Sequence, residues 1–142
     1  MSAERILVTG GAGFIGSHLV DALLAKGHAV RVLDDLSSGK VSNLPLSNPA
    51  LKLVIGDVSD AATLAEAMRG CSAVVHLAAV ASVQASVEDP VRTHQSNFIG
   101  TLRVCEAMLA AGIRRVVFAS SAAVYGNNGE GTAIDEDTPK SP

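Results

Sequence analysis

Three glycines, Gly10, Gly13 and Gly16, form the part of the sequence whose residue types and spacing are most specific for a chemical role. Each can meet a separate steric requirement: a tight strand-to-helix turn, close approach of the backbone to a diphosphate, and close packing of a helix on a strand. A helix that begins near Phe14 would offer its unpaired N–H groups to the phosphates. A glycine triplet alone is a weak signal, because turns collect glycine, but here it predicts a dinucleotide site.

Asp34 strengthens this interpretation. Residues 5–9 have the composition of a buried parallel strand, an apolar helical pattern ends at Gly27, and residues 29–33 form a second strand that leads into Asp34. The carboxylate follows the glycines by about twenty residues, the spacing needed to accept hydrogen bonds from ribose 2′- and 3′-hydroxyl groups. Since no arginine follows Asp34 to receive a 2′-phosphate, NAD is favoured over NADP as the cofactor.

The remaining elements must bring these residues together. Further strands are predicted at residues 51–55, 73–77 and 115–119, a short helix after the caps Ser59 and Asp60, and a long helix from Pro90 to Gly112. The segments 81–89 and 127–142 are expected to be loops. Alternating strands and helices predict an α/β fold, a Rossmann-type doubly wound parallel sheet with strand order 3-2-1-4-5. In that order the polar turns after the strands meet at one edge of the sheet.

Within the long helix, apolar residues at helical spacing are predicted to share a face, which Asn97 and Gly100 interrupt. The members of that face are Phe98, Leu102, Cys105, Met108 and Leu109.

Composition excludes several functional classes. The chain has 142 residues, 48% of them hydrophobic, and a formal net charge of −3, which fits one globular domain. It has no basic run, so nucleic acid and anionic membrane surfaces are not expected as partners. No apolar run reaches the length of a membrane span and no signal-peptide pattern is present, so a cytoplasmic location is expected.

The cysteines and histidines do not predict a metal site. Cys71 and Cys105 fit neither a metal-binding pair nor a disulfide framework, and both are expected to be buried and reduced. The four histidines never occur at i,i+4 or beside a cysteine, so no metal is predicted. His76, at the end of a predicted strand, is interpreted as a packing residue held by hydrogen bonds.

The sequence resembles the extended short-chain dehydrogenase/reductases, and among them the UDP-hexose 4-epimerases. The resemblance covers nearly the whole chain and is carried by the segments 9–16, 33–39, 56–58, 76–79, 97–101 and 120–126. It implies an NAD site in which Phe14 and Ile15 offer backbone N–H groups to the diphosphate and Asp34 holds the adenine ribose. The full set of cofactor-binding residues that it implies is Gly10, Gly13, Phe14, Ile15, Gly16, Asp34, Asp35, Leu36, Ser37, Ser38, Gly39, Asp57, Val58, Leu77, Ala78, Ala79, Asn97 and Ala119.

Several of these roles have structural alternatives. The resemblance places Asp57 and Val58 around adenine, yet Asp57 could only cap the following turn. It places residues 77–79 along the nicotinamide half, supported by Asn97, which could only satisfy nearby backbone. Ser121 is the implied catalytic residue, hydrogen-bonded to the 4-hydroxyl group of the substrate.

The implied reaction is the inversion of C4 of a UDP-sugar by removal and return of a hydride through a 4-keto intermediate. The family takes the hydroxyl proton with the Tyr of a Tyr-x-x-x-Lys motif, which is absent here: Tyr125 is the only tyrosine and Gly129 follows it by four. The 142 residues are therefore expected to be the N-terminal part of a longer enzyme, inactive alone, without its sugar-binding domain. Family members commonly form homodimers, with residues 90–111 as one of the contacting helices.

Other functions remain open at this point. A nucleotide-sugar dehydratase or decarboxylase belongs to the same class, although Ala122 and Ala123 stand where dehydratases carry an acid pair. A non-catalytic nucleotide-binding module is the alternative from another class. Between substrates, residues 80–83 lack the lysine found in epimerases restricted to unmodified hexoses, which favours UDP-N-acetylglucosamine over UDP-glucose.

Overall fold

Five parallel strands form one sheet at the centre of the molecule. A computed structural model describes residues 4–127, 131 and 133–142. The strands are β1 (Arg5–Thr9), β2 (Ala29–Asp34), β3 (Leu51–Ile55), β4 (Ala73–His76) and β5 (Arg115–Phe118). They pair in the order β3-β2-β1-β4-β5, with Val8 beside Val32 on one side and Val75 on the other. The predicted fold class and strand order are confirmed.

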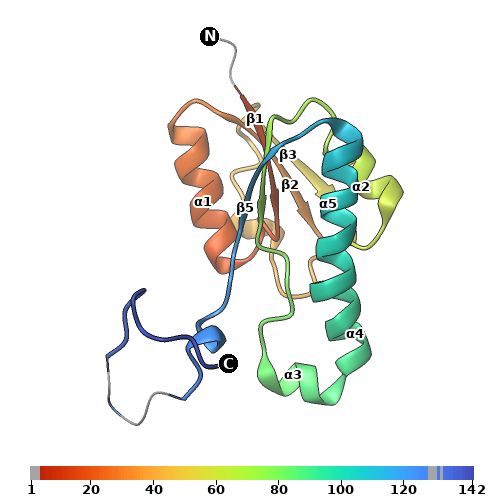
Figure 1. The fold of residues 1–142 in the computed structure, drawn as a ribbon. Helices are drawn as coiled ribbons and strands as arrows, with labels where there is room; N and C mark the ends of the chain where they lie inside the picture. The colour runs from red at the N-terminus through yellow and green to blue at the C-terminus, as the bar shows by residue number, and fades with distance from the viewer. Residues whose placement is uncertain (1–3, 128–130, 132) are drawn as a thin grey trace.

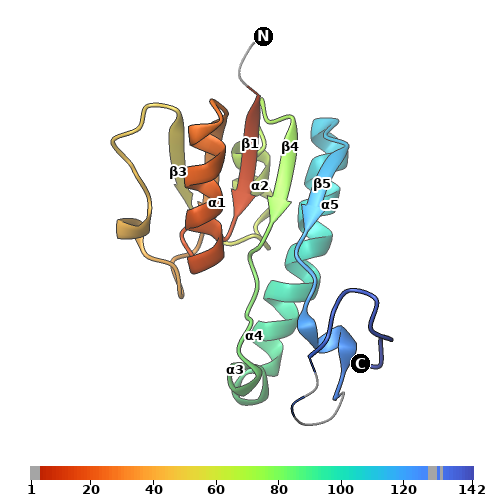
Figure 2. The ribbon, with the colours of Figure 1, turned by 90° about the vertical axis from the view of Figure 1, so that its left-hand side faces the viewer.

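Helices cover both faces of this sheet (Figure 1). Helix α1 (Phe14–Ala25) lies on one face, and α2 (Ala61–Ala67) and α5 (Gly100–Ala111) lie on the other. The view from the α1 side shows α1 in front of the strands and α5 behind them (Figure 2). All four strand pairs are parallel, so the carboxyl ends of the strands share one edge of the sheet.

Alternation along the strands divides the core into two halves. On β1, Ile6 and Val8 face α1 and belong to a cluster with Val20, whereas Leu7 belongs to a cluster with Val104 on the α2 and α5 side. Successive side chains of a strand point to opposite faces, so a strand buried on both faces is apolar at every position. This is why β1 has the run Ile6, Leu7 and Val8 without a polar residue.

The segment after β4 differs from its prediction as a loop. It contains α3 (Val83–Glu88), and α4 (Pro90–His94) follows after Asp89. The Ser82 hydroxyl caps α3 by accepting from the Ala85 N–H at 3.2 Å. One helical turn later, the Gln84 amide donates to Glu88 at 2.8 Å. Local capping and an i,i+4 pair therefore form this helix without a periodic apolar face.

The long helix from Pro90 to Gly112 is present, but it is continuous only through one π-helical turn, Gln95–Ile99, between α4 and α5. Its predicted apolar face is wrong in part: Met108 is buried, whereas Phe98 and Leu109 are 62% and 81% exposed. Gly100 and Val104 lie on the buried side of α5 with Met108. Small side chains at the contact allow close approach of α5, because a Cβ at Gly100 would lie 2.7 Å from a Val58 methyl.

The cysteines also differ from expectation. Cys71 is half-buried and Cys105 is exposed, on the α5 side that turns away from the sheet, although both thiols are free as expected. Burial raises the pKa of the Cys71 thiol.

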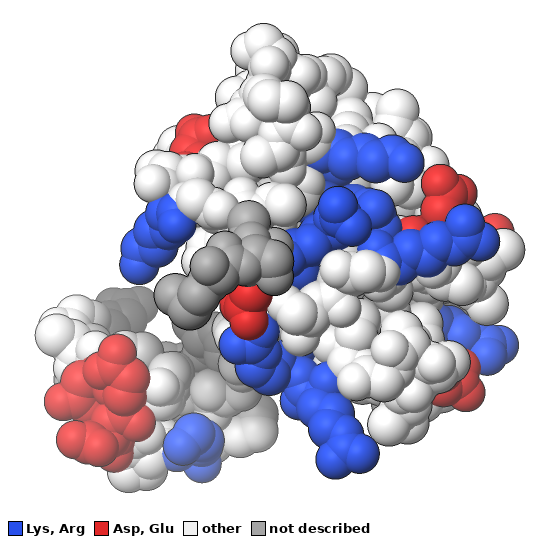
Figure 3. All heavy atoms as spheres, turned by 90° about the horizontal axis from the view of Figure 1, so that it is seen from above, with Lys and Arg blue, Asp and Glu red and all other residues white. Residues whose placement is uncertain are grey.

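Basic side chains gather at one end of the sheet. Seen from above, Lys and Arg side chains cross the end of the molecule at which the strands begin (Figure 3). Arg5 and Arg115 start β1 and β5 there, and Arg115 pairs with Glu4. Within the described residues, no helix is long and apolar enough to cross a membrane.

Candidate functional site

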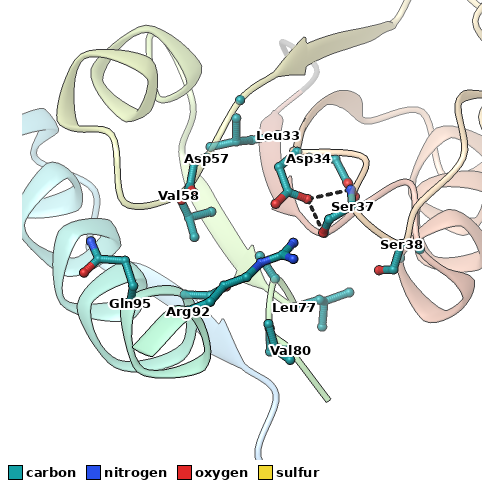
Figure 4. A pocket seen from close by; sticks show the side chains of 18 of the residues that line it. Leu33, Asp34, Ser37, Ser38, Asp57, Val58, Leu77, Val80, Arg92 and Gln95 are labelled. Atoms are coloured by element: carbon teal, nitrogen blue, oxygen red, sulfur yellow. Dashed lines mark hydrogen bonds between the residues drawn. The ribbon is translucent and has the colours of Figure 1, made fainter. Parts of the chain in front are cut away.

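A cavity of about 590 Å³ opens at the carboxyl ends of the strands. Its walls come from the turn between β1 and α1, from the ends of the other four strands, and from the first turns after Asp89 (Figure 4). Open parallel sheets place ligands at this edge, on either side of the point where the strand order reverses. Here that point lies between β1 and β4.

Two positions at the turn between β1 and α1 leave no room for a side chain. Gly10 has φ +69°, and a Cβ there would lie 2.8 Å from the Ala78 nitrogen of the neighbouring loop. A Cβ at Gly16 would collide with the Gly10 carbonyl oxygen, so only glycine lets α1 lie this close to the turn. The missing side chain at Gly10 therefore lets the β1 and β4 loops lie close together beside the cavity.

The N-terminus of α1 faces the cavity without a side-chain cap. Gly13 is the N-cap residue and makes no side-chain hydrogen bond, and Gly13, Phe14, Ile15 and Gly16 all line the cavity. The first-turn N–H groups of a helix have no intrahelical acceptor. They therefore offer a set of donors to an anion, and the positive end of the helix dipole adds to the attraction.

Asp34 lies at the end of β2 and is 7% exposed. One carboxylate oxygen accepts from the Ala12 N–H at 2.9 Å, and the other accepts from the Leu36 N–H at 2.9 Å. Both bonds are to main-chain groups of the two loops beside the cavity, so they fix the carboxylate in its place. Each carboxylate oxygen keeps a further lone pair that can accept from a ligand hydroxyl.

Two further acidic residues line the same side. The Asp35 carboxylate accepts from the N–H and hydroxyl of Ser37, at 2.9 and 2.6 Å. The Asp57 carboxylate accepts from the Ser59 N–H at 2.7 Å, while Asp57 and Val58 also line the cavity. The capping alternative for Asp57 is therefore realised, and it leaves the second carboxylate oxygen without a hydrogen bond to any described residue.

The opposite wall, formed by residues 77–80 after β4, is held by a buried hydrogen-bond network. The Thr9 hydroxyl lies 2.6 Å from Nδ1 of His76, and the Thr101 hydroxyl lies 2.9 Å from Nε2. Thr101 donates its proton to the Asn97 carbonyl at 2.6 Å, so it must accept from Nε2–H. His76 is then neutral, with Nδ1 accepting from Thr9, as expected for a hydrogen-bonded packing residue.

This network fixes the backbone of the wall. The Thr9 oxygen also accepts from the N–H groups of Leu77 and Ala78, each at 3.2 Å. Burial lowers the pKa of His76 from its ordinary value, since the charged imidazolium is poorly solvated there. Next along the wall, the Asn97 amide accepts from Val80 N–H at 2.7 Å and donates to its carbonyl at 3.0 Å.

Most of the residues predicted to bind the cofactor come together in this cavity. They are Gly10, Gly13, Phe14, Ile15, Gly16, Asp34, Asp35, Ser37, Ser38, Asp57, Val58, Leu77, Ala78, Ala79 and Ala119.

Four predicted site residues are not among those that line it. Leu36 packs on the core, and Gly39 lies behind Asp34, where an added Cβ would be 3.0 Å from Oδ1. Asn97 holds the Val80 loop from outside. Ser121 lies after β5 and is exposed. It is the N-cap of the short 3-10 helix η3 (Ala122–Tyr125), and its oxygen accepts from the Ala123 N–H at 3.2 Å.

The sequence analysis missed other lining residues. They are Leu33, Gly56, Val80, Asp89, Val91, Arg92, Gln95 and Ser96. Half of them lie in or directly beside α4, whose start at Pro90 was predicted. The signal was available, because a helix that follows the β4 loop begins at the same edge as the other turns. Among the described residues, no group of three His, Cys, Asp or Glu could hold a metal ion.

Comparisons with known proteins agree on one family. The model of the NAD dependent epimerase/dehydratase family matches residues 6–142. UDP-glucose 4-epimerase of Mycolicibacterium smegmatis is 49% identical over 128 residues, which cover 86% of this chain and 40% of that protein. The chain thus spans about two fifths of the length of such curated relatives.

Solved structures give the same result. The Thermus thermophilus UDP-glucose 4-epimerase in complex with NAD is 44% identical with a TM-score of 0.86, covering 97% of this chain and 44% of that one. UDP-N-acetylglucosamine 4-epimerase of Methanobrevibacter ruminantium M1, in complex with UDP-N-acetylmuramic acid, is 40% identical with a TM-score of 0.84. The match covers all of this chain and 45% of the chain from M. ruminantium.

Proposed function

Because the chain belongs to the NAD dependent epimerase/dehydratase family, we propose that its cavity binds NAD and that it provides the cofactor-binding part of a UDP-sugar 4-epimerase. The observation that carries the proposal is the position of the uncapped N-terminus of α1 and the fixed Asp34 carboxylate in one cavity wall. A diphosphate and a ribose diol are adjacent in NAD, so donors and an acceptor are needed side by side. The cavity offers both.

The residues that line the cavity include the donors and acceptors that the cofactor needs. N–H groups of Phe14 and Ile15 would hold the diphosphate and Asp34 the adenine ribose. Asp57 and Val58 would flank adenine, with the free oxygen of Asp57 accepting from its amino group. Leu77, Ala78 and Ala79 would border the nicotinamide, on backbone held in place by Thr9 and His76. When bound, NAD would accept the hydride from C4 of the sugar and return it to the opposite face.

Ser121 would hold the 4-hydroxyl group of the sugar. Its oxygen already accepts from the Ala123 N–H, so its own proton remains to be donated to the substrate oxygen. A serine hydroxyl cannot remove the 4-hydroxyl proton near neutral pH. The base therefore has to be a residue other than Ser121. The proposed role of Ser121 is to position the reacting oxygen and to stabilise its developing charge.

The test has two parts. Calorimetric titration of the purified 142-residue protein with NAD should give saturable 1:1 binding, and absence of binding contradicts the proposal. The complete gene product, incubated separately with UDP-glucose and UDP-N-acetylglucosamine, should give the C4 epimer of at least one, with the N-acetylated sugar preferred. Release of a 4-keto-6-deoxy sugar instead would identify a dehydratase.

Ser121 can be tested in the same assay. In the complete gene product, Ser121→Ala should lower kcat by about a hundredfold, as for the loss of one donor to a developing oxyanion. Ser120→Ala is the matched control, since it removes a hydroxyl one residue away, and it should leave kcat within about threefold. Equal effects of the two substitutions would contradict the role of Ser121.

We propose that the protein associates as a homodimer through the exposed side of α5. Leu102 and Leu109 on α5, together with Phe98 in the π-helical turn before it, form an apolar stripe that is 47–81% exposed. A stripe of this kind is typical of surfaces that pair. Sedimentation of the complete gene product should show a dimer that Leu109→Lys converts to monomer, and an unchanged dimer would place the interface elsewhere.

A further inference from the structure

Arg92 is a cavity residue for which the fold has no structural use. It lies in the first turn of α4, and its side chain extends from that helix across the cavity, with the guanidinium directed toward the side on which Asp34 and Ser37 lie (Figure 4). The side chain is exposed, and no hydrogen bond or ion pair joins its guanidinium to any residue that the structure describes. The guanidinium instead projects into the cavity.

The backbone of Arg92, in contrast, is fixed. Its N–H donates to the Asp89 carboxylate at 3.0 Å, and Asp89 is the N-cap of α4, with Pro90 in the first turn. The wall behind it is held by the Asn97 amide, which binds Val80 through both its N–H and its carbonyl. The Cα of Arg92 therefore has a defined place, while its guanidinium is held by no hydrogen bond to a described residue.

The charged residues that line the cavity are mainly acidic. Four carboxylates line it, those of Asp34, Asp35, Asp57 and Asp89, and Arg92 is the only Lys or Arg among the described residues that do so. At the opposite end of the sheet, by contrast, Lys and Arg side chains cross the surface (Figure 3). These carboxylates would repel a ligand with two phosphate charges, and a cation that approached the ligand would offset that repulsion.

The N–H groups of α1 approach such a ligand from one wall, and Arg92 lies on the other. Guanidinium groups bind phosphate oxygens with two parallel N–H donors, a geometry that lysine lacks. We infer that Arg92 is a further cofactor-binding residue, which closes over the diphosphate of the dinucleotide from α4 and offsets the surrounding carboxylates. This inference rests on the proposed function, because it assumes the same ligand.

The test compares ligands with and without the diphosphate. NMR titrations of the 142-residue protein would measure Kd for NAD, ADP-ribose and adenosine. Arg92→Gln should weaken NAD and ADP-ribose by at least about tenfold, the loss expected for a charge-assisted hydrogen bond, and change adenosine by less than about twofold. Arg92→Lys keeps the charge but not the two-donor geometry. Its Kd values for NAD and ADP-ribose should therefore lie between those of wild type and those of Arg92→Gln. The difference between wild type and Arg92→Gln should shrink as salt is added.

Arg103→Gln is the matched control. Arg103 is a half-exposed arginine on α5 that pairs only with Glu106 on the same helix, so its removal should leave all three affinities unchanged. Asp34→Asn marks the ribose site and should weaken all three ligands.

The outcomes separate the inference from the proposed function. If wild type binds NAD but Arg92→Gln binds every ligand within about twofold of it, the inference about Arg92 is wrong and the proposed function stands. Equal weakening of adenosine and ADP-ribose would also overturn the inference, because it would show a change in the cavity as a whole. If wild type binds neither NAD nor ADP-ribose, the proposed function fails and the role of Arg92 fails with it.

Discussion

At the scale of single residues, Asp34 should decide which dinucleotide is accepted. Asp34→Asn replaces one acceptor oxygen with an NH₂ group that faces the N–H of Ala12 or Leu36, and it removes the charge that would repel a 2′-phosphate. We expect NAD to bind about tenfold more weakly, and the preference for NAD over NADP to decrease. Calorimetric titration with both dinucleotides measures this.

Asp60→Asn is the control for Asp34→Asn. Asp60 caps α2 at the surface by accepting from the Thr63 N–H at 2.8 Å, and asparagine is an equally good N-cap residue. This variant should bind both dinucleotides as wild type does. If Asp34→Asn kept the wild-type ratio of NAD to NADP affinity, the carboxylate would not be the discriminating group.

His76 should make the stability of the fold depend on pH. Burial lowers its pKa in the folded state, so below about pH 6.5 the unfolded chain takes up a proton that the folded chain does not. The contribution of His76 to the free energy of unfolding therefore has its full value above that pH. It decreases as the pH falls toward the folded-state pKa. Urea unfolding between about pH 7.5 and 5.5 should show this decrease.

His76→Gln should reduce that dependence. Glutamine cannot take up a proton, so the variant should be less stable at about pH 7.5, where it lacks the bonds to Thr9 and Thr101, but lose less of its stability by about pH 5.5. His28→Gln, in the loop before β2 and outside this network, should keep the wild-type slope. A His76→Gln variant with the wild-type slope would mean that other groups cause the acid sensitivity.

At the scale of elements, the contact between α1 and the glycine turn is the least tolerant part of the fold. In Gly16→Ala the new methyl group would overlap the Gly10 carbonyl and lie 2.6 Å from the Gly11 Cα, and both neighbours are main chain that β1 holds. We expect a loss of about 1–3 kcal/mol in the free energy of unfolding, with loss of NAD binding as α1 is displaced. Denaturant titration and calorimetry measure the two effects.

Gly27→Asn is the matched control for Gly16→Ala. Gly27 has φ +82° after α1, nothing lies within 4 Å of an added Cβ, and asparagine tolerates this conformation best after glycine. Its cost should be below about 1 kcal/mol. If Gly16→Ala were as mild as the control, close packing of α1 would not explain the glycine.

The elements also show how far the sequence could predict this fold. Strand order and the carboxyl-edge site were predictable, because β-branched runs such as residues 5–9 alternate with helical patterns and each strand is followed by a turn. The helix α3 was not, since six residues are too few for a periodic signal. The buried side of α5 was not either: apolar residues occur on two sides of it, and only the sheet decides that Val104 faces inward and Leu109 outward.

The site has the same division. Asp34 and the glycines were found because chemistry fixes their residue types and spacing. Arg92 and Gln95 were missed: Pro90 indicates a helix that begins at this edge, but the sequence does not indicate which of its side chains line the cavity. The family resemblance implied that Leu36 and Gly39 bind the cofactor, whereas neither lines the cavity and Leu36, with φ 59°, packs on the core.

At the scale of the whole molecule, the sheet is covered unevenly. The side chains of β5 are exposed, with Val117 at 62% and Phe118 at 58%, while those of β1 and β2 are almost completely buried. The β5 side should therefore open first, since few buried contacts hold it. Its inner neighbour β4 also carries the wall of the cavity, so the stability of this half should respond to the ligand.

NAD should consequently stabilise the fold as a unit. Its proposed site has walls from β1, β2 and β3 on one side and from β4, α4 and β5 on the other, so a bound dinucleotide connects the firmly packed half to the exposed one. At a free concentration of about 100 Kd, binding to the folded state alone adds about 2.7 kcal/mol, which for a chain of this length is a rise in Tm of about 10 °C. Differential scanning calorimetry measures the rise.

Hydrogen exchange in the presence of NAD should slow in β5 as well as in β1, whereas adenosine at the same multiple of its Kd should protect the β1 to β3 half only. Equal protection of β5 by the two ligands would show that the halves are coupled through the sheet and not through the dinucleotide.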